Sequence, residues 1–124
     1  MPFDVKMGHD GILRVVLSGD LDQVIIDRLD RDLAPFIEAS TPEQPLKRLM
    51  YFQQIEQISV DLRRYLSDLN EDDRIGKTAY INPSRRARVL AQFINKATGR
   101  ENIATFDHEN EALRWFLTHQ DKIE

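Results

Sequence analysis

Strand-like and helix-like patterns alternate along this 124-residue chain, and their order limits the possible folds more than any other feature. Apolar residues recur at every second position, or in short runs, in some segments and at helical spacing in the segments between them. The first two strand patterns flank Gly8–Gly11, whose glycines suit a tight turn. The expected strands are Phe3–Met7, Ile12–Leu17, Leu46–Phe52, Lys77–Ile81 and Ile103–Phe106. This order predicts an α/β fold with an N-terminal β-hairpin, then alternating helices and mostly parallel strands, about five strands and four helices.

Two of the expected helices have features that bear on their boundaries and faces. In the first helix, Pro35 has no N–H to donate to the carbonyl of Arg31, so we expect a kink or an early stop there. A later helix begins at Asn82–Ser84 and ends at Gly99, a residue suited to a helix C-terminus. The expected buried face of this later helix consists of Ala87, Leu90, Phe93 (or Val89), Ile94 and Ala97.

Polar residues interrupt three of the strands. Strands covered by helices on both faces read as continuous apolar runs, yet Arg14, Thr78 and Thr105 alternate with core residues. One explanation is a sheet face that is only half covered and so is open to a partner. The other is an edge effect or a buried threonine whose hydroxyl is satisfied within the protein.

The composition indicates one globular domain over residues 1–124. The net charge of −4 argues against nucleic acid as a partner, and no apolar run approaches the length of a membrane span, so no membrane insertion is expected. The absence of cysteine excludes disulfides and thiolate zinc sites. A cytoplasmic location is the default expectation.

One stretch, from Lys77 to Arg100, contains six basic residues and no acidic residue. Arg85, Arg86 and Arg88 lie in the first turns of the expected helix, where the helix dipole favours acids by about a few tenths of a kcal/mol per charge. Guanidinium groups at a helix start suit a phosphate or carboxylate, so these three arginines form an anion-binding candidate. The alternative is a solvated face whose arginines pair with the acids of Glu71–Asp73. No glycine-rich phosphate loop accompanies the arginines.

The chain resembles the sulfate-transporter/anti-sigma-factor-antagonist (STAS) superfamily, especially its uncharacterised bacterial SpoIIAA-like relatives. Four features carry the resemblance: the opening hairpin, the turn at Ser18–Asp22, the strand-to-helix junction at Leu49–Leu62 and the ending at Phe106–Leu117. The resemblance implies a STAS-like fold.

In phosphorylatable members of that superfamily, a segment similar to Asp-Ser-Ser-Gly opens the second helix, and a partner kinase phosphorylates its serine. The matching positions here are Ser59, Val60 and Asp61, so valine stands at the switch position and no glycine follows. Ser59 is the candidate if the match shifts by one residue, although a helix cap is its simpler role. The resemblance thus implies a partner-binding surface at Ser59, Val60 and Asp61, without the phosphoserine switch.

Other clusters give no indication of catalysis. The aspartates of the first helix, Asp20 to Asp32, are interleaved with Arg28 and Arg31, which is typical of a solvent-facing surface and not of a metal site. The histidines are isolated, and no serine stands in a nucleophile elbow. We therefore expect no enzyme activity, no cofactor and no metal.

Three functional hypotheses follow. The first is a non-enzymatic regulatory or protein-interaction module, as the resemblance implies. The second is a binder of a small anionic metabolite or lipid head group through the arginines at the helix start. The third is a homodimer that uses an exposed face of the sheet.

Overall fold

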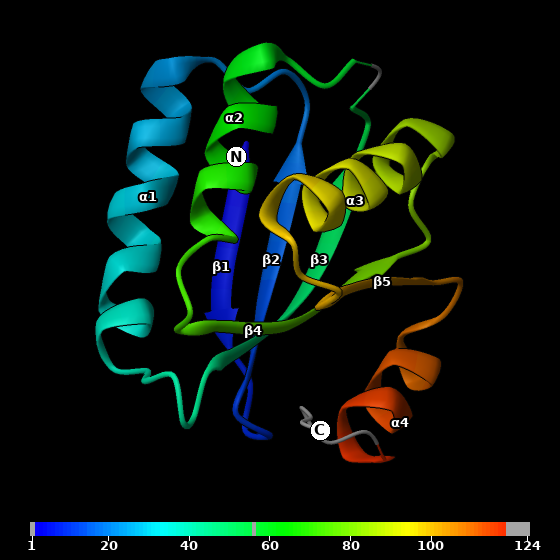
Figure 1. Cartoon of the computed structure of the whole chain (residues 1–124). Coiled ribbons are helices and arrows are strands. Elements are labelled where there is room, and N and C mark those ends of the chain that lie inside the picture. Colours follow the sequence, from blue (N-terminus) through cyan, green and yellow to red (C-terminus); the bar gives the residue numbers. More distant parts are fainter. Residues whose placement is uncertain (1, 56, 119–124) are drawn as a thin grey trace.

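The computed structural model describes residues 2–55 and 57–118, which form a five-stranded sheet and four helices (Figure 1). The strands are β1 (Phe3–Met7), β2 (Ile12–Ser18), β3 (Leu46–Gln53), β4 (Ile75–Ile81) and β5 (Ile103–Phe106). The helices are α1 (Gln23–Glu38), α2 (Val60–Leu69), α3 (Arg85–Thr98) and α4 (Glu109–Thr118). Strand order in the sheet follows chain order, and only the β1–β2 pair is antiparallel among these strands. The predicted α/β arrangement is confirmed.

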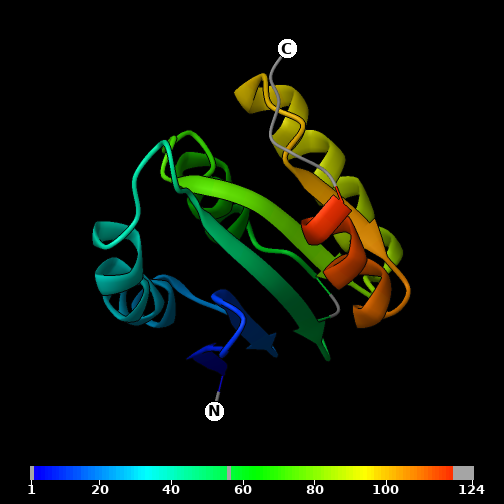
Figure 2. The ribbon, with the colours of Figure 1, turned by 90° about the horizontal axis from the view of Figure 1, so that it is seen from below.

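Three helices pack on one face of the sheet and α4 packs on the other. Successive strand residues point to opposite faces. Accordingly, Met50 lies in the core formed with α1, α2 and α3, whereas its neighbour Leu49 packs with Ala112 and Phe116 of α4. Figure 2, the view from below, places α1 at the β1 end of the sheet and both α3 and α4 at the β5 end.

The larger core holds α2 and α3 in place over the sheet. Each helix contributes buried aliphatic side chains at helical spacing, such as Leu62 and Leu66 from α2 and Leu90 and Ile94 from α3. Burying one such side chain contributes about 1.5–3 kcal/mol relative to leaving it exposed. This packing brings α2 and α3 into contact with each other.

Serine side chains fix where α2 and α3 begin. Ser59 Oγ accepts a hydrogen bond from the N–H of Leu62 at 3.0 Å, and Ser84 Oγ accepts one from the N–H of Ala87 at 3.2 Å. Each bond satisfies a first-turn N–H that has no partner within the helix. Because β3 and β4 are parallel, both helices start beyond the carboxyl edge of the sheet, where α/β folds commonly bind ligands.

The expectation of a stop at Pro35 is wrong. Helix α1 continues to Glu38, and the N–H of Ala39 donates to the carbonyl of Pro35 at 3.1 Å. Leu33 and Ile37 are buried on either side of the proline. Their burial offsets the hydrogen bond that Pro35 cannot make.

The buried face of α3 also differs from the expected one. The buried residues are Ala87, Leu90, Ala91 and Ile94, whereas Phe93, Val89 and Ala97 are exposed. Phe93 is 47% exposed because it lies one residue, about 100° of helix rotation, away from the buried stripe. Two apolar side chains of α3, Val89 and Phe93, are therefore left outside the core.

Arg48 and Thr78 form a buried polar pair on the face of the sheet that α1, α2 and α3 cover. The Arg48 side chain is buried, and its Nε and Nη2 donate to Thr78 Oγ1 at 3.1 and 3.0 Å. The Thr78 hydroxyl in turn donates to the carbonyl of Gly76 at 3.1 Å. Burial lowers the pKa of Arg48. Thr78 therefore interrupts the apolar pattern of β4 as a buried threonine whose hydroxyl is satisfied within the protein, which confirms the second of the two explanations for this residue.

Candidate functional site

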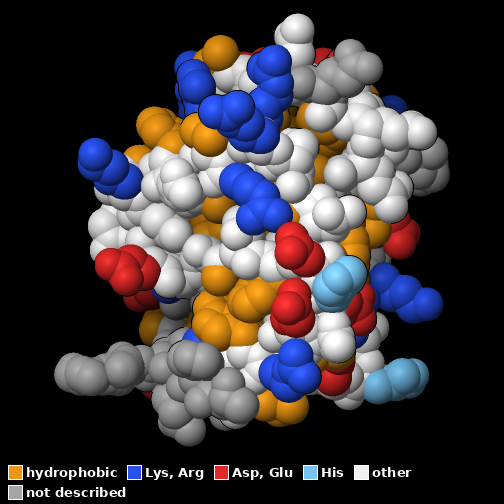
Figure 3. All heavy atoms as spheres, turned by 90° about the vertical axis from the view of Figure 1, so that its right-hand side faces the viewer, with side chains coloured by type: hydrophobic (Ala, Val, Ile, Leu, Met, Phe, Trp, Pro, Cys, Tyr) orange, Lys and Arg blue, Asp and Glu red, His pale blue; other side chains and the backbone are white. Residues whose placement is uncertain are grey.

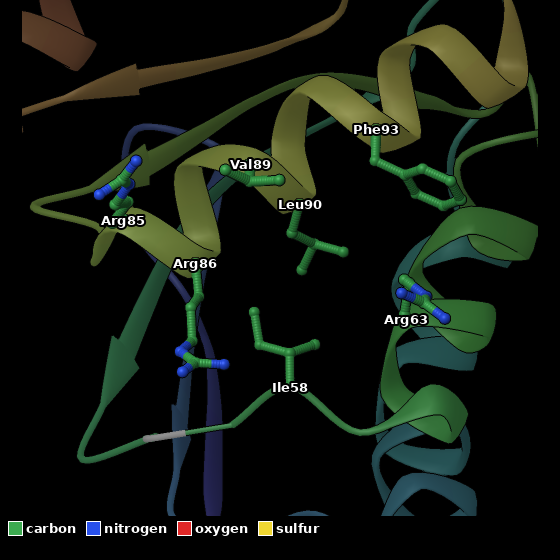
Figure 4. Close-up of a pocket in the computed structure, with 7 residues that line it drawn as sticks. All are labelled: Ile58, Arg63, Arg85, Arg86, Val89, Leu90 and Phe93. Atoms are coloured by element: carbon green, nitrogen blue, oxygen red, sulfur yellow. The ribbon is translucent and has the colours of Figure 1, made fainter.

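A pocket of about 440 Å³ lies between α2 and α3 (Figure 4). We call it the α2–α3 pocket and define it by its lining residues: Ile58, Arg63, Arg85, Arg86, Val89, Leu90 and Phe93. Ile58 comes from the loop before α2, Arg63 from the first turn of α2, and the other five from α3. In Figure 4, Ile58 and Leu90 point toward each other from the two sides. The volume falls in the range of small-molecule sites, about 300–1,000 Å³.

Ser59 makes two hydrogen bonds at the end of the loop that carries Ile58. Besides accepting from Leu62, Ser59 Oγ donates to the carbonyl of Leu21 at 3.3 Å. The bond to Leu21 connects the start of α2 to the segment that precedes α1. Ser59 thus fills the capping role that its sequence position suggested, and its hydroxyl has partners within the protein.

Arg85 and Arg86 supply cationic groups to the lining of the pocket, and in Figure 4 Arg86 extends toward Ile58 whereas Arg85 lies on the other side of the helix start. They are the first two residues of α3, and both are exposed. Within residues 2–55 and 57–118, neither guanidinium forms a hydrogen bond or an ion pair. Figure 3 shows Lys and Arg side chains gathered on the upper part of the face at which α3 begins. Their N–H donors are therefore available to a ligand.

Arg63 is a third cationic residue of the pocket and was not among the residues predicted from the sequence. Its guanidinium carbon lies 5.6 Å from the centre of the Phe93 ring, a cation–π distance worth about 0.5–1 kcal/mol at an exposed site. A signal was present in the sequence. Arg63 lies one turn after the capping Ser59. Because both helices start at the same edge of the sheet, a cationic residue in the first turn of α2 is expected to lie near the arginines in the first turn of α3.

Arg88, in contrast, lies outside the pocket. Its Nη2 donates to Asp107 at 3.1 Å and its Nη1 donates to Thr105 Oγ1 at 3.3 Å. These bonds hold α3 against β5 and the turn that follows it. The structure therefore divides the predicted cluster: Arg85 and Arg86 share the pocket with Arg63, and Arg88 has a structural partner.

The acids of Glu71–Asp73 are not the partners of these arginines. Asp72 Oδ2 instead accepts from Arg74 Nη2 at 2.7 Å. The alternative explanation, in which the arginines at the start of α3 pair with these acids, is wrong for the described residues.

Val60 and Asp61, the other two members of the predicted partner-binding surface, open α2. Val60 is 55% exposed, and Asp61 is half-buried in the first turn, where the helix dipole favours a carboxylate. The loop residue Ile58 connects them to the pocket through Ser59. Both sequence-predicted sites therefore lie at one region of the molecule, around the starts of α2 and α3.

The lining residues determine what the pocket can do. Guanidinium groups donate hydrogen bonds and stay protonated, so they bind anions and do not exchange protons with a substrate. The apolar side chains offer contact for hydrocarbon. In the part of the chain that the structure describes, no three His, Cys, Asp or Glu side chains gather into a metal-binding group. Nor does any helix within those ranges have the length and apolar character to cross a membrane.

Comparison with known proteins identifies the fold. No protein-family model matches the sequence, and no curated protein matches it. The structure is similar to that of an uncharacterised protein of the DUF3478 family from Shewanella loihica PV-4, which has a SpoIIAA-like fold. The TM-score is 0.69 over 91% of this chain and 90% of that chain, at 15% sequence identity. The chain therefore has a SpoIIAA-like fold, as the sequence resemblance predicted.

Proposed function

We propose that this protein is a non-enzymatic, STAS-like binding module that holds a small anionic ligand in the α2–α3 pocket. One observation carries the proposal: Arg63, Arg85 and Arg86 line the pocket together with apolar side chains, and no acidic residue among those that the structure describes lines it. Three like charges in one place repel one another unless a counter-charge arrives. An anion supplies that counter-charge.

The lining also defines the chemical class of the ligand. A carboxylate or phosphate accepts two parallel hydrogen bonds from one guanidinium, a geometry that a lysine cannot offer. Ile58, Leu90 and Phe93 supply apolar surface beside these charges. The best-fitting ligand is thus an anion with a hydrocarbon body of modest size, such as a medium-chain acid or a phosphomonoester.

Support for a non-enzymatic role comes from the same residues. General acid–base catalysis needs a group that gains and loses a proton near neutral pH. Among the described residues, those that line the pocket are arginines and residues with hydrocarbon side chains. We place the module, residues 1–124 acting as one domain, in the cytoplasm on the basis of its composition.

A thermal-shift series tests the proposal. The probes are inorganic phosphate, octyl phosphate and octanoate, added to the wild type, to Arg85→Glu/Arg86→Glu and to Arg28→Glu/Arg31→Glu. The last variant is a matched control, because Arg28 and Arg31 are exposed on α1 and the net charge changes equally. We expect a saturable rise in Tm in the wild type and the control that is absent in the pocket variant. No rise with any probe, or an equal rise in all three proteins, would refute the proposal.

A second candidate function is a regulatory protein-interaction module, the role that the STAS resemblance implies for Ser59, Val60 and Asp61. The exposure of Val60 on α2 and of Val89 and Phe93 on α3 supports it, since exposed apolar side chains suit a protein contact. Capture of a defined partner should be lost with Val60→Lys and retained with Val24→Lys. Val24 is a fair control because it is an exposed valine in the first turn of α1. Equal loss in both variants would argue against this surface.

A further inference from the structure

Strand β1 is an edge strand with one free side. In the described sheet it pairs only with β2, in the register Phe3 with Leu17 through Met7 with Leu13. The N–H of Ser18 donates to the carbonyl of Pro2, and the N–H of Gly8 donates to the carbonyl of Ile12. Because backbone groups alternate along a strand, the groups of even-numbered residues face β2. The N–H and C=O groups of Phe3, Val5 and Met7 therefore face outward.

Exposed edges of this kind template further pairing unless the chain protects them. Within residues 2–55 and 57–118, no backbone or side-chain hydrogen bond reaches the outward groups of Phe3, Val5 or Met7. The strand contains no proline between Phe3 and Met7 and pairs with β2 without a register shift. Its edge is thus free to accept another strand.

We propose that the protein forms a two-fold symmetric dimer in which β1 pairs antiparallel with β1 of a second copy, centred on Val5. The charges of the strand select this partner. With Val5 opposite itself, Asp4 of each chain lies opposite Lys6 of the other, and Phe3 lies opposite Met7. Opposite charges at facing positions contribute about 0.2–1 kcal/mol per pair, and like charges there are destabilising.

Other symmetric registers are disfavoured by the same charges. A shift that centres the pairing on Asp4 places two carboxylates face to face, and a shift that centres it on Lys6 places two ammonium groups face to face. A register centred between two residues places outward-facing residues of one strand opposite inward-facing residues of the other, so their N–H and C=O groups do not meet. Only the Val5-centred register joins outward donors to outward acceptors and unlike charges to each other.

The surroundings of Lys6 agree with this arrangement. Lys6 lies opposite Arg14 of β2, a like charge, and Arg14 already pairs with Asp10 at 3.1 Å and with Glu109 at 3.5 Å. In the described ranges Lys6 has no ion pair. Asp4 of a second copy supplies the missing acid. The dimer would double the number of strands in the sheet, and none of the residues that line the α2–α3 pocket belongs to β1.

A charge-swap series monitored by analytical ultracentrifugation tests the dimer. Asp4→Lys and Lys6→Asp should each weaken dimerisation at least tenfold, because each places like charges opposite each other. The double variant Asp4→Lys/Lys6→Asp should restore dimerisation to within about threefold of the wild type. Glu101→Lys, an exposed residue before β5 at the far edge, is the control for net charge and should leave the dimer intact. Circular dichroism confirms that each variant is folded.

Disulfide trapping supplies a second test, which is clean because the chain contains no cysteine. Asp4→Cys chains mixed with Lys6→Cys chains should cross-link faster than either variant alone, since residues 4 and 6 face each other only in the proposed register. A wild type that stays monomeric, a dimer that the single charge reversals leave intact, or cross-linking that is no faster in the mixture would overturn the proposal.

Discussion

Two hollows flank α2, and they have opposite character. In the part of the chain that the structure describes, the α2–α3 pocket on one side is lined by three arginines and four apolar residues. On the other side, between α1 and α2, lies a hollow of about 330 Å³ that we call the α1–α2 groove. Its lining residues are Gln23, Ile26, Asp27, Asp30, Tyr65, Asp68, Leu69 and Asp72. The same helix thus separates a cationic site from an acidic one.

The difference in charge is accompanied by a difference in hydrogen bonding. In the α1–α2 groove, polar groups bind one another: Tyr65 donates its hydroxyl to Asp30 at 3.0 Å and Gln23 donates to Asp27 at 2.8 Å. In the α2–α3 pocket, Arg85 and Arg86 have no such partners among the described residues. Asp27 and Asp30 thus have partners within the groove, whereas Arg85 and Arg86 of the pocket have donors available to a ligand.

The largest expected effect comes from reversing one charge in the pocket. Arg86→Glu removes charge-assisted hydrogen bonds and adds a repulsive carboxylate, so the affinity for octyl phosphate should fall about 30- to 100-fold. Asp27→Lys, the corresponding reversal in the groove, should change the affinity by less than about twofold. Isothermal titration calorimetry measures both variants, and equal losses would remove the distinction between the two hollows.

A smaller effect is expected from the apolar side of the pocket. Phe93→Ala removes a half-exposed ring that contacts Arg63, so the affinity for octyl phosphate should fall about five- to tenfold. Binding of inorganic phosphate should not change, because that probe has no hydrocarbon. The free energy of unfolding, from urea titration, should fall by less than about 1 kcal/mol. A loss of phosphate binding would show that Phe93 acts on the arginines instead.

In the groove, Tyr65→Phe should affect stability and leave ligand binding unchanged. Loss of the bond to Asp30 should lower the free energy of unfolding by up to about 1 kcal/mol at pH 7. Burial first, and Asp30 second, raise the pKa of Tyr65 in the folded protein. The unfolded chain therefore releases this proton first, and wild-type stability falls as pH rises above about 10. The phenylalanine variant lacks this loss, so its deficit should shrink or reverse at high pH.

The smallest expected effect concerns Asp72 at the rim of the groove. The side-chain hydrogen bond from Arg74 is the main cause that holds the pKa of Asp72 below its usual range. The hydrogen bond therefore stabilises the protein fully when the pH is above the pKa that Asp72 has in the unfolded chain. The stabilisation disappears as the pH falls through the lower pKa that Asp72 has in the folded protein. Arg74→Gln should therefore destabilise the protein at pH 7 and converge with the wild type in acid. Unfolding curves that stay parallel down to about pH 2 would contradict this assignment.

The sequence predicted the features that depend on local pattern. The hairpin follows from alternation around Gly8–Gly11, and the start of α2 follows from Ser59, whose capping depends only on a residue three positions away. The start of α3 was predicted from Asn82–Ser84, and the structure makes Ser84 the capping residue. Arg85 and Arg86 were placed at a helix start for the same reason.

Features that depend on tertiary packing were missed. The exposure of Phe93 and its contact with Arg63 depend on how α3 is rotated against α2, which no local pattern encodes. Arg88 finds Asp107 only after β5 is placed beside β4. The burial of Arg48 depends on a threonine 30 residues away on the neighbouring strand.

Binding of an anion in the α2–α3 pocket can be followed residue by residue. The most direct measurement is an amide and arginine side-chain NMR titration of the wild type with octyl phosphate. We expect saturable shifts at Ile58–Arg63 and Ser84–Val89, including the side-chain N–H groups of Arg85 and Arg86. Shifts that instead cluster at Asp27, Asp30 and Tyr65, or no shifts at saturating probe, would contradict it.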